Sequence, residues 1–317
     1  IQKSYKEDDE VQRIIELAEQ RIFSISQNRS INTFSEIKEV LMTVFNQLEE
    51  RAKSGGGITG LATGYTDLDR MTSGLQKSDL ILLAARPSMG KTALALNIAM
   101  NVVKNGASVA LFSLEMSEEQ YVQRIISQEA MVDSTKLRTG NLDDDDWTRL
   151  INTMSLISNY KIYIDDTPSV TLFEMMSKCR RLKIEKGLDL IVVDYLQLMS
   201  DGGRTDNRQQ EISNISRGLK ALARELDCPV LALSQLSRAP EIRNDHRPVM
   251  SDLRESGAIE QDADVVMMLY RDEYYNKEES EKKGITDVII TKQRNGPVGT
   301  VELAWIGQYT KFGNIQK

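Results

Sequence analysis

The pattern of apolar and polar positions divides the chain into a helical N-terminal part and a longer part in which strands alternate with helices. Apolar residues recur at helical spacing over residues 11–25 and again over 37–48, and residues 54–57 interrupt the pattern with three glycines. The first stripe runs through Val11, Ile14, Ala18 and Ile22 and has too few apolar neighbours to build a core. We therefore expect it to be an interaction helix that docks on another surface.

From residue 79 onward, short β-branched runs alternate with helical periods. Strands are expected at residues 80–84, 108–113, 190–193, 230–233 and 265–269, and helices at 93–104, 118–131 and 209–226. Near-continuous apolar strands separated by helices predict an α/β fold whose mostly parallel sheet is covered on both faces. Two later runs, 287–291 and 298–304, predict a C-terminal β-hairpin with a tight turn at Asn295-Gly296.

Composition narrows the class of protein without naming a function. The 317 residues include 40 Lys and Arg against 47 Asp and Glu, a net charge of −7, and 40% are hydrophobic. This balance is typical of a globular protein and excludes collagen-like, disordered and disulfide-scaffold classes. No apolar run approaches the ~18 residues of a membrane span, and no secretion signal is visible, so we expect a cytoplasmic protein without membrane contact. Cys179 and Cys228 fit a reducing compartment, and His246 is interpreted as a surface residue.

The strongest chemical signal follows the first predicted strand of the sheet. Residues 85–92 read Ala-Arg-Pro-Ser-Met-Gly-Lys-Thr, between a buried strand and a helix, which is the context of a phosphate-binding loop. Alanine stands where the first glycine is usual, and its methyl group is small enough for the turn. The nucleotide-binding residues predicted here are Ser88, Met89, Gly90, Lys91, Thr92 and Ala93. Lys91 would reach the β- and γ-phosphates, and Thr92 would be a ligand of Mg²⁺.

Three further polar residues stand at predicted strand ends. Asp194 ends an apolar strand and is the partner that Thr92 and magnesium-bound water need. Glu115 lies beyond residues 108–113, where it could activate water for hydrolysis, although it also precedes a helix whose cap is Ser117 with Gln120. Gln235 follows the strand at 230–233 and is either a γ-phosphate sensor or an ordinary loop residue.

Taken together, the motifs resemble one family. The resemblance rests on Thr63–Asp69, the loop at 85–92, Ser113–Ser117, Val193–Gln197, Ser234–Arg238 and Thr291–Gly296, in this order. The chain is similar to the RecA-like motor domain of DnaB-type bacterial replicative helicases over about residues 58–310. The resemblance implies a linker helix in residues 1–30 that docks on a neighbouring subunit and a motor domain in 58–317. Between them, the apolar pattern and the glycines predict an amphipathic helix with a glycine-rich linker in 31–57.

The same resemblance implies the activity, the partners and further site residues. It implies a homohexamer that hydrolyses ATP with Mg²⁺ at subunit interfaces and moves 5′ to 3′ on single-stranded DNA, with primase and a helicase loader as partners. Lys292 and Arg294 would act on the nucleotide of the adjacent subunit. The loop residues Arg254, Glu255 and Gly257 would contact the DNA backbone, as would Arg204.

The acidic net charge argues against a DNA ligand, but six copies of Arg254 around one channel would form a local anion site. From the sequence alone, an ion pair of Arg254 with Asp252 or Glu255 is the simpler interpretation. Two other classes stay open: another RecA-like hexameric ATPase, such as a recombinase relative or a clock-type kinase, and a nucleotide-bound scaffold or loader subunit with negligible turnover.

Overall fold

The computed structural model describes residues 36–53, 57–200, 208–253 and 257–315. The chain separates into two units, residues 1–57 and 58–317. In the first unit, α2 spans Ile37–Lys53, where the second apolar stripe predicted a helix. The first stripe, with its predicted interaction helix, lies outside the described residues.

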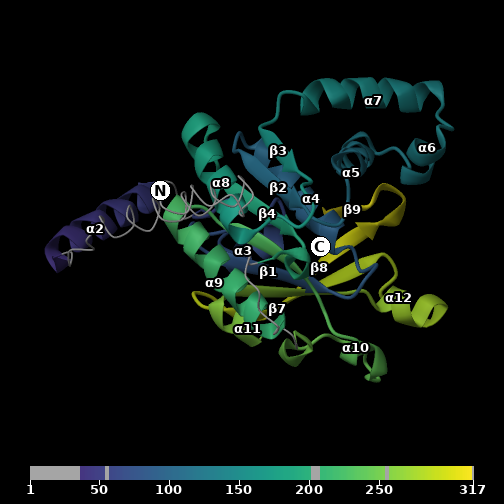
Figure 1. Ribbon diagram of the computed structural model, residues 1–317. Coiled ribbons are helices and arrows are strands. Elements are labelled where there is room, and N and C mark those ends of the chain that lie inside the picture. The colour runs from purple at the N-terminus through teal and green to yellow at the C-terminus, as the bar shows by residue number, and fades with distance from the viewer. Residues whose placement is uncertain (1–35, 54–56, 201–207, 254–256, 316–317) are drawn as a thin grey trace, which may run out of the picture. The chain divides into compact units, whose positions relative to one another are not determined.

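In the described part of the second unit, nine strands form one mixed sheet (Figure 1). The strands are β1 Leu80–Ala85, β2 Val109–Ser113, β3 Ile162–Asp165, β4 Leu190–Asp194, β5 Val230–Gln235, β6 Val265–Tyr270, β7 Ile285–Gln293, β8 Gly299–Ile306 and β9 Lys311–Asn314. Their order is β3-β2-β4-β5-β1-β6-β7-β8-β9. The first six strands in this order are parallel to one another, and β7, β8 and β9 each run antiparallel to the strand before them. The predicted α/β class with a mostly parallel sheet is confirmed.

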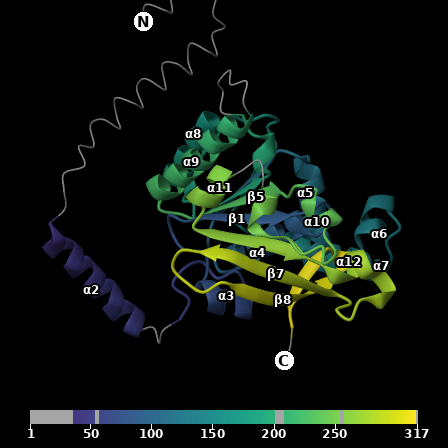
Figure 2. The same ribbon diagram turned by 90° about the horizontal axis from the view of Figure 1, so that it is seen from below.

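Helices cover both faces of this sheet. The helices are α3 Thr66–Thr72, α4 Lys91–Lys104, α5 Glu118–Ala130, α6 Ser134–Thr139, α7 Asp144–Ile157, α8 Leu172–Lys186, α9 Arg208–Leu226, α10 Ala239–Ile242, α11 Gly257–Asp262 and α12 Asp272–Asn276. Figure 2 shows α8, α9 and α11 on one side of the strands and α3 on the other. None of the described helices has the length and apolar character needed to cross a bilayer.

Alternation along β1 explains why both faces are covered. Ile81 and Leu83 pack in a core with α3, α4 and α5, whereas Leu80 and Leu82 pack in a second core with α8, α9 and α11. Successive side chains of a strand point to opposite faces, so a strand with no polar position needs a helical layer on each side. The strand therefore holds the loop that follows it from both sides.

Three local predictions need correction. The connection between β7 and β8 runs from residue 294 to 298 and is not a tight two-residue turn, because β7 continues to Gln293 and the last pair with β8 is Ile290 with Gly299. The short strands β3 and β9 had not been predicted. His246 is half-buried rather than a plain surface residue: its ring stacks on Tyr275 at 4.3 Å, and its Nδ1 lies 3.0 Å from the carbonyl oxygen of Pro240.

Candidate functional site: a nucleotide cavity at the carboxyl edge of the sheet

The loop after β1 has the backbone shape of an anion cradle. Ser88 and Gly90 have φ values of 67° and 97°, and Gly90 precedes the first residue of α4. A Cβ atom on Gly90 would lie 2.9 Å from the Phe312 ring, so both the backbone angle and the space require glycine there. Ala85 stays in the extended backbone of β1, which explains why alanine is tolerated. The first N–H groups of α4 have no partner within the helix and are available to phosphate.

A cavity of about 740 Å³ opens above this loop. Its lining includes the predicted residues Ser88, Gly90, Lys91, Thr92, Ala93, Glu115 and Gln235. Two predicted residues do not line it: Met89, whose side chain is buried in the core, and Asp194, which is fully buried behind the loop. Met89 could therefore contribute only its backbone to a bound nucleotide.

Asp194 joins the loop to β4. Its carboxylate is fully buried, Thr92 Oγ1 donates to Oδ2 at 2.7 Å, and Lys91 Nζ lies 3.6 Å from Oδ1. The Lys91 ammonium also sits 4.3 Å from the centre of the Tyr195 ring. Burial lowers the pKa of Lys91, and the nearby charges of Asp194 and Glu115 oppose that shift. The structure thus brings the predicted lysine, threonine and aspartate into one cluster.

A second hydroxyl reaches the same carboxylate. Tyr121 of α5 donates to Asp194 Oδ2 at 2.6 Å, so this oxygen accepts two hydrogen bonds. Burial and the neighbouring Asp194 raise the pKa of Tyr121 well above its ordinary value, which keeps the hydroxyl protonated as a donor. Sequence reasoning did not single out Tyr121, because an aromatic residue at helical spacing with Ile125 and Gln128 is typical of a core position.

The oxygen atoms in this cluster fit a magnesium ion. Asp194 Oδ1 is buried without a hydrogen-bond partner among the described residues, and the Thr92 hydroxyl oxygen is held beside the same carboxylate. Carboxylate and hydroxyl oxygens are ligands that Mg²⁺ accepts, and this ion usually takes its remaining ligands from water and phosphate. No group of three or more His, Cys, Asp or Glu residues that could hold a metal ion occurs among the described residues.

Glu115 and Gln235 reach the cavity from neighbouring strands. Ser113 pairs with Asp194, and the N–H of Leu114 donates to the Asp194 carbonyl at 2.8 Å, so Glu115 follows directly beside the cluster. Gln120 Oε1 accepts from the Ser117 N–H at 3.4 Å and provides the helix cap. Glu115 is exposed to the cavity and makes no hydrogen bond to the described residues.

Gln235 pairs with Ala85 at the end of β5. Its backbone is held by the Gln197 side chain, which accepts from the Gln235 N–H at 3.3 Å and donates to the Gln235 carbonyl at 3.2 Å. The backbone is therefore fixed while the exposed side chain remains available to a ligand in the cavity.

The other walls of the cavity come from segments that the sequence analysis left aside. Arg124 of α5, Arg138 of α6, and Trp305 and Thr310 from the β8 and β9 region line it. Arg271 lies over the Trp305 ring at 4.8 Å and donates to the Ser88 carbonyl at 3.5 Å, which links this wall to the phosphate loop. The sequence motifs could not predict these contacts, because each contact joins segments that are distant in sequence.

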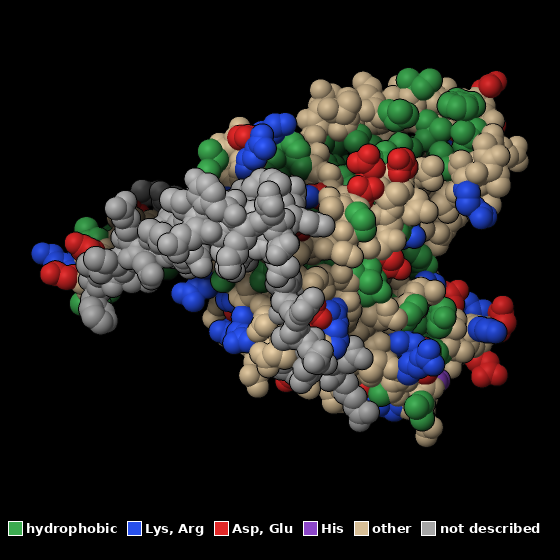
Figure 3. Space-filling view, in the orientation of Figure 1, with side chains coloured by type: hydrophobic (Ala, Val, Ile, Leu, Met, Phe, Trp, Pro, Cys, Tyr) green, Lys and Arg blue, Asp and Glu red, His purple; other side chains and the backbone are tan. Residues whose placement is uncertain are grey.

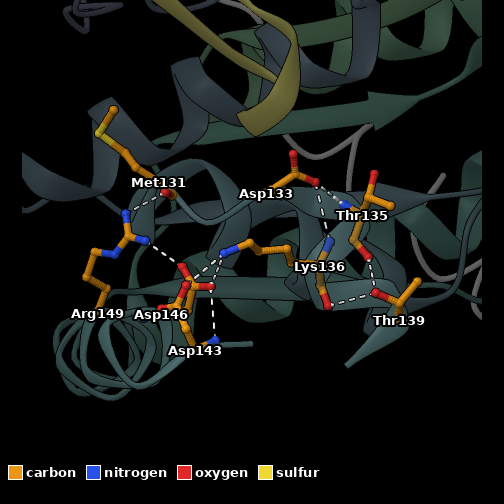
Figure 4. A network of polar contacts seen from close by, with 8 residues as sticks. All are labelled: Met131, Asp133, Thr135, Lys136, Thr139, Asp143, Asp146 and Arg149. Carbon is orange, nitrogen blue, oxygen red and sulfur yellow. Dashed lines mark hydrogen bonds and ion pairs between the residues drawn. The ribbon is translucent and has the colours of Figure 1, made fainter. Parts of the chain in front are cut away.

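A polar network holds α6 against α7 (Figure 4). Asp146 is buried and accepts from Lys136 at 2.6 Å and from Arg149 at 2.5 Å, while Asp133 caps α6 through the N–H groups of Thr135 and Lys136. This network fixes the helix that carries Arg138 to the cavity.

Lys292 and Arg294 do not reach this cavity in their own chain. Lys292 pairs with Val266 near the start of β6, and the Arg294 N–H donates to the carbonyl of Asp264, which precedes β6. They lie at the amino edge of the parallel strands, whereas the cavity lies at the carboxyl edge. The side chains donate to carbonyl groups at the end of α11: Lys292 to Glu260 at 2.5 Å, and both cations to Gln261 at 3.1 and 3.0 Å.

The predicted DNA-contacting residues fall mostly outside the described residues. Arg204, Arg254 and Glu255 do so, and Gly257 is the first residue of α11. Asp252, one partner considered for Arg254, is buried and pairs with Arg243 at 2.7 Å.

Comparison with known proteins agrees with this geometry. Residues 60–314 match the family model described as the DnaB-like helicase C terminal domain. The chain is 55% identical to the replicative DNA helicase DnaB of Geobacillus stearothermophilus and 54% identical to the replicative DNA helicase DnaC of Bacillus subtilis (strain 168). In both cases the alignment covers 100% of this chain and 70% of the relative.

Solved structures give the same result. One of them, an ATPase domain, superposes with a TM-score of 0.86 at 45% identity, covering 90% of this chain and 100% of that one. A DnaB-like replicative helicase, solved in a study of its interactions with primase, gives a TM-score of 0.85 at 44% identity, covering 96% of this chain and 74% of that one. The resemblance and the RecA-like fold inferred from the motifs are thereby confirmed. The chain belongs to the family of DnaB-like replicative DNA helicases, which are ATP-dependent enzymes.

Proposed function

We propose that this chain is the motor of a homohexameric ring that hydrolyses ATP with Mg²⁺ at subunit interfaces and moves 5′ to 3′ along single-stranded DNA. The observation that carries the proposal is the division of the predicted residues between two edges of the sheet. Lys91, Thr92 and Glu115 line the cavity, with Asp194 buried against Thr92 and Lys91, whereas Lys292 and Arg294 lie at the opposite edge. A second subunit is needed to bring the two sets together.

Within one cavity, each side chain has a distinct proposed task. Lys91 holds the β- and γ-phosphates, and Thr92 and Asp194 hold the metal ion through oxygen atoms. The bound ion would neutralise charge on the phosphate oxygens. Glu115 accepts the proton of the attacking water, and Gln235 hydrogen-bonds the γ-phosphate from the end of β5. The freedom of Glu115 from hydrogen bonds to the described residues supports its assignment as the base.

An exposed apolar stripe supports assembly. Trp147, Ile151 and Met154 of α7 are 53%, 64% and 54% exposed and follow helical spacing. Figure 3 shows hydrophobic side chains gathered at the upper right, over the region where Figure 1 places α7. A contiguous apolar surface of this kind is typical of a protein contact. By family resemblance, we also propose that single-stranded DNA contacts Arg254, Glu255, Gly257 and Arg204. On the same basis, we propose primase and a helicase loader as partners in the cytoplasm.

Two assays on one preparation test the proposal. ATPase activity is measured with and without single-stranded DNA, and unwinding is measured on a forked duplex. If the chain is a ring motor, single-stranded DNA should stimulate its ATP hydrolysis, and the protein should separate the strands of the fork. Another RecA-like hexameric ATPase would hydrolyse ATP without separating strands, and a scaffold or loader subunit would show negligible turnover. A native mass measurement would not distinguish these three, since each can form a ring.

A further inference from the structure

The Asp194 carboxylate is held asymmetrically. Thr92 donates to Oδ2 at 2.7 Å and Tyr121 donates to the same oxygen at 2.6 Å, whereas Oδ1 is buried with no hydrogen-bond partner among the described residues. Because a carboxylate can rotate about its Cβ–Cγ bond, two donors on one oxygen decide which oxygen stays free. The oxygen without a hydrogen bond is the one that forms an ion pair with Lys91 Nζ at 3.6 Å, on the side of the phosphate loop.

Tyr121 cannot act on a nucleotide directly. Its side chain is 2% exposed and does not line the cavity, although its helix neighbours Gln120, Gln123 and Arg124 do. Its ring packs in the core that contains α4, and its hydroxyl reaches the carboxylate from α5. Tyr121 therefore influences the site through Asp194.

The two donors differ in what else they must do. Under the function proposed above, the Thr92 hydroxyl oxygen is itself a metal ligand. The Tyr121 hydroxyl stands outside the cavity and donates to the carboxylate. Groups that orient a metal ligand from behind contribute to metal affinity even though they do not touch the ion.

We propose that Tyr121 is a positioning residue that holds the Asp194 carboxylate with Oδ1 free to face the metal ion of the nucleotide site. The inference rests on the proposed Mg²⁺–nucleotide site. The alternative is that Tyr121 is a core residue whose hydroxyl only satisfies a nearby buried acceptor.

The chain offers a matched control in Tyr65. This tyrosine is also 2% exposed and belongs to the same apolar cluster, but its hydroxyl donates to Asn97 at 3.3 Å. Replacing either tyrosine by phenylalanine removes one buried hydroxyl from the same core. Only the Tyr121 change removes a donor from Asp194.

The test is an equilibrium titration of the full chain with N-methylanthraniloyl-ADP, with Mg²⁺ varied. We expect Tyr121→Phe to bind the nucleotide normally without Mg²⁺, while the Mg²⁺ concentration that half-saturates the gain in affinity rises about 10- to 100-fold. Tyr65→Phe should keep the wild-type Mg²⁺ dependence. This readout does not require turnover.

Several outcomes would overturn the inference. Wild-type Mg²⁺ dependence in Tyr121→Phe would show that the hydroxyl has no positioning role. An equal shift of the Mg²⁺ dependence in both variants would also contradict it. If nucleotide-free Tyr121→Phe melts below the assay temperature while Tyr65→Phe stays folded, the Tyr121 hydroxyl serves folding and the inference is again wrong. A wild-type protein whose nucleotide affinity ignores Mg²⁺ would instead contradict the proposed metal site itself.

Discussion

Two carboxylates beside the phosphate loop have opposite environments. Asp194 is buried and receives hydroxyl groups from Thr92 and Tyr121, whereas Glu115 faces the cavity without a hydrogen bond to the described residues. A group held by several partners is suited to positioning, and an unbonded group is free to take a proton. The difference in contacts agrees with the separate roles expected from the sequence, Asp194 beside the metal and Glu115 as the base.

The role of Glu115 is tested by removing its basicity while keeping its shape. Glu115→Gln should still bind ATP, and its turnover should fall about 10²- to 10⁴-fold, the usual contribution of a positioned base. Steady-state ATPase and equilibrium nucleotide binding measure the two quantities separately. Glu118→Gln changes an exposed carboxylate on the next helix that does not line the cavity, and should be near wild type. Near-normal turnover in Glu115→Gln would remove Glu115 from the mechanism.

Asp79 makes stability depend on pH. Burial and the nearby carboxylate of Asp264 raise the pKa of Asp79 to about 6, against a weaker opposing effect of Lys220 at 3.8 Å. The folded state therefore holds this proton more tightly than the unfolded state. The stabilisation is fully present below about pH 4 and is lost as pH rises to about 6.

Asp79→Asn should remove this dependence. Relative to wild type, the variant should gain about 1 kcal/mol in free energy of unfolding at pH 7 and almost nothing at pH 4. The gain at pH 7 is smaller than the roughly 3 kcal/mol of a fully buried group, because Asp79 is only partly buried and solvent screens its charge. Urea unfolding of the nucleotide-free protein at pH 4, 5 and 7 measures the difference. Asp144→Asn, at an exposed position of α7, serves as the control. An Asp79→Asn effect of the same size at all three pH values would contradict the explanation.

At the scale of elements, α6 and α7 depend on ion pairs more than on an apolar core. The small core cluster here contains Ala130, Val132 and Leu150, and α6 has no buried residue. The buried Asp146 of α7 supplies the connection by accepting from Lys136 of α6, and Arg149 of α7 also donates to it (Figure 4). Of these two helices, α6 lines one wall of the nucleotide cavity, and α7 supports it.

Asp146→Ala should therefore loosen this region selectively. We expect a loss of about 2 kcal/mol in free energy of unfolding, the usual cost of losing a charged hydrogen bond, and faster hydrogen exchange over residues 131–157. Exchange in the strands β1 to β6 should change little. Mass spectrometry of exchanged peptides measures exchange in residues 131–157 and in the strands, and chemical unfolding measures the free energy of unfolding.

The neighbouring Asp145 provides a matched substitution. It is exposed on α7, so Asp145→Ala should leave exchange unchanged. Equal effects of the two substitutions would show that the network adds nothing beyond surface charge.

The connection between β7 and β8, which carries Arg294 and follows Lys292, is held in place by contacts with another element. Gln293, between them, donates to the Met71 carbonyl at 3.1 Å and packs where a Cβ on Gly296 would stand. This contact ties the hairpin to α3. The two cations are thus presented by a supported loop rather than by a free turn.

At the scale of the whole molecule, the residues proposed for catalysis are divided between the two edges of one sheet. β6 has six residues, so it spans roughly 17 Å and separates Arg294 from the carboxyl edge of the same chain. An arginine that completes the site of an adjacent subunit contributes about 10³- to 10⁵-fold in rate in comparable phosphoryl-transfer enzymes. In the isolated chain its guanidinium instead lies 3.4 Å from Asp264 and donates to Gln261.

Mixing two inactive variants tests action between subunits. Arg294→Ala and Glu115→Gln chains should each lack turnover, whereas mixed assemblies contain some interfaces with an intact Glu115 and an intact Arg294. ATPase above the sum of the separate variants is the expected result. Native mass measurement shows whether the assemblies contain both variants. If such mixed assemblies recover no ATPase activity, Arg294 does not complete the site of an adjacent subunit at interfaces that work independently.

Much of the site was predictable because its chemistry is local in sequence. The phosphate loop needs Gly90, Lys91 and Thr92 in succession between a strand and a helix, and Asp194 ends a continuous apolar run. Tyr121, Arg124 and Trp305 were not predictable in the same way, because an aromatic or basic residue on an amphipathic element has the same pattern whether or not it borders a ligand. β9 was missed because Lys311–Asn314 is short and becomes a strand only by pairing with β8.

The sequence by itself determined the class of fold and the loop that binds phosphate, because backbone periodicity and a strand-to-helix turn depend on neighbouring residues. Only the tertiary structure decided that Tyr121 and Thr92 share one oxygen of Asp194, and that Lys292 and Arg294 lie at the edge opposite the cavity. Those facts depend on strand order and on the packing of α5, which join residues far apart in the chain. Pairings over such distances follow from the packing of the whole sheet and leave no periodic trace in the sequence.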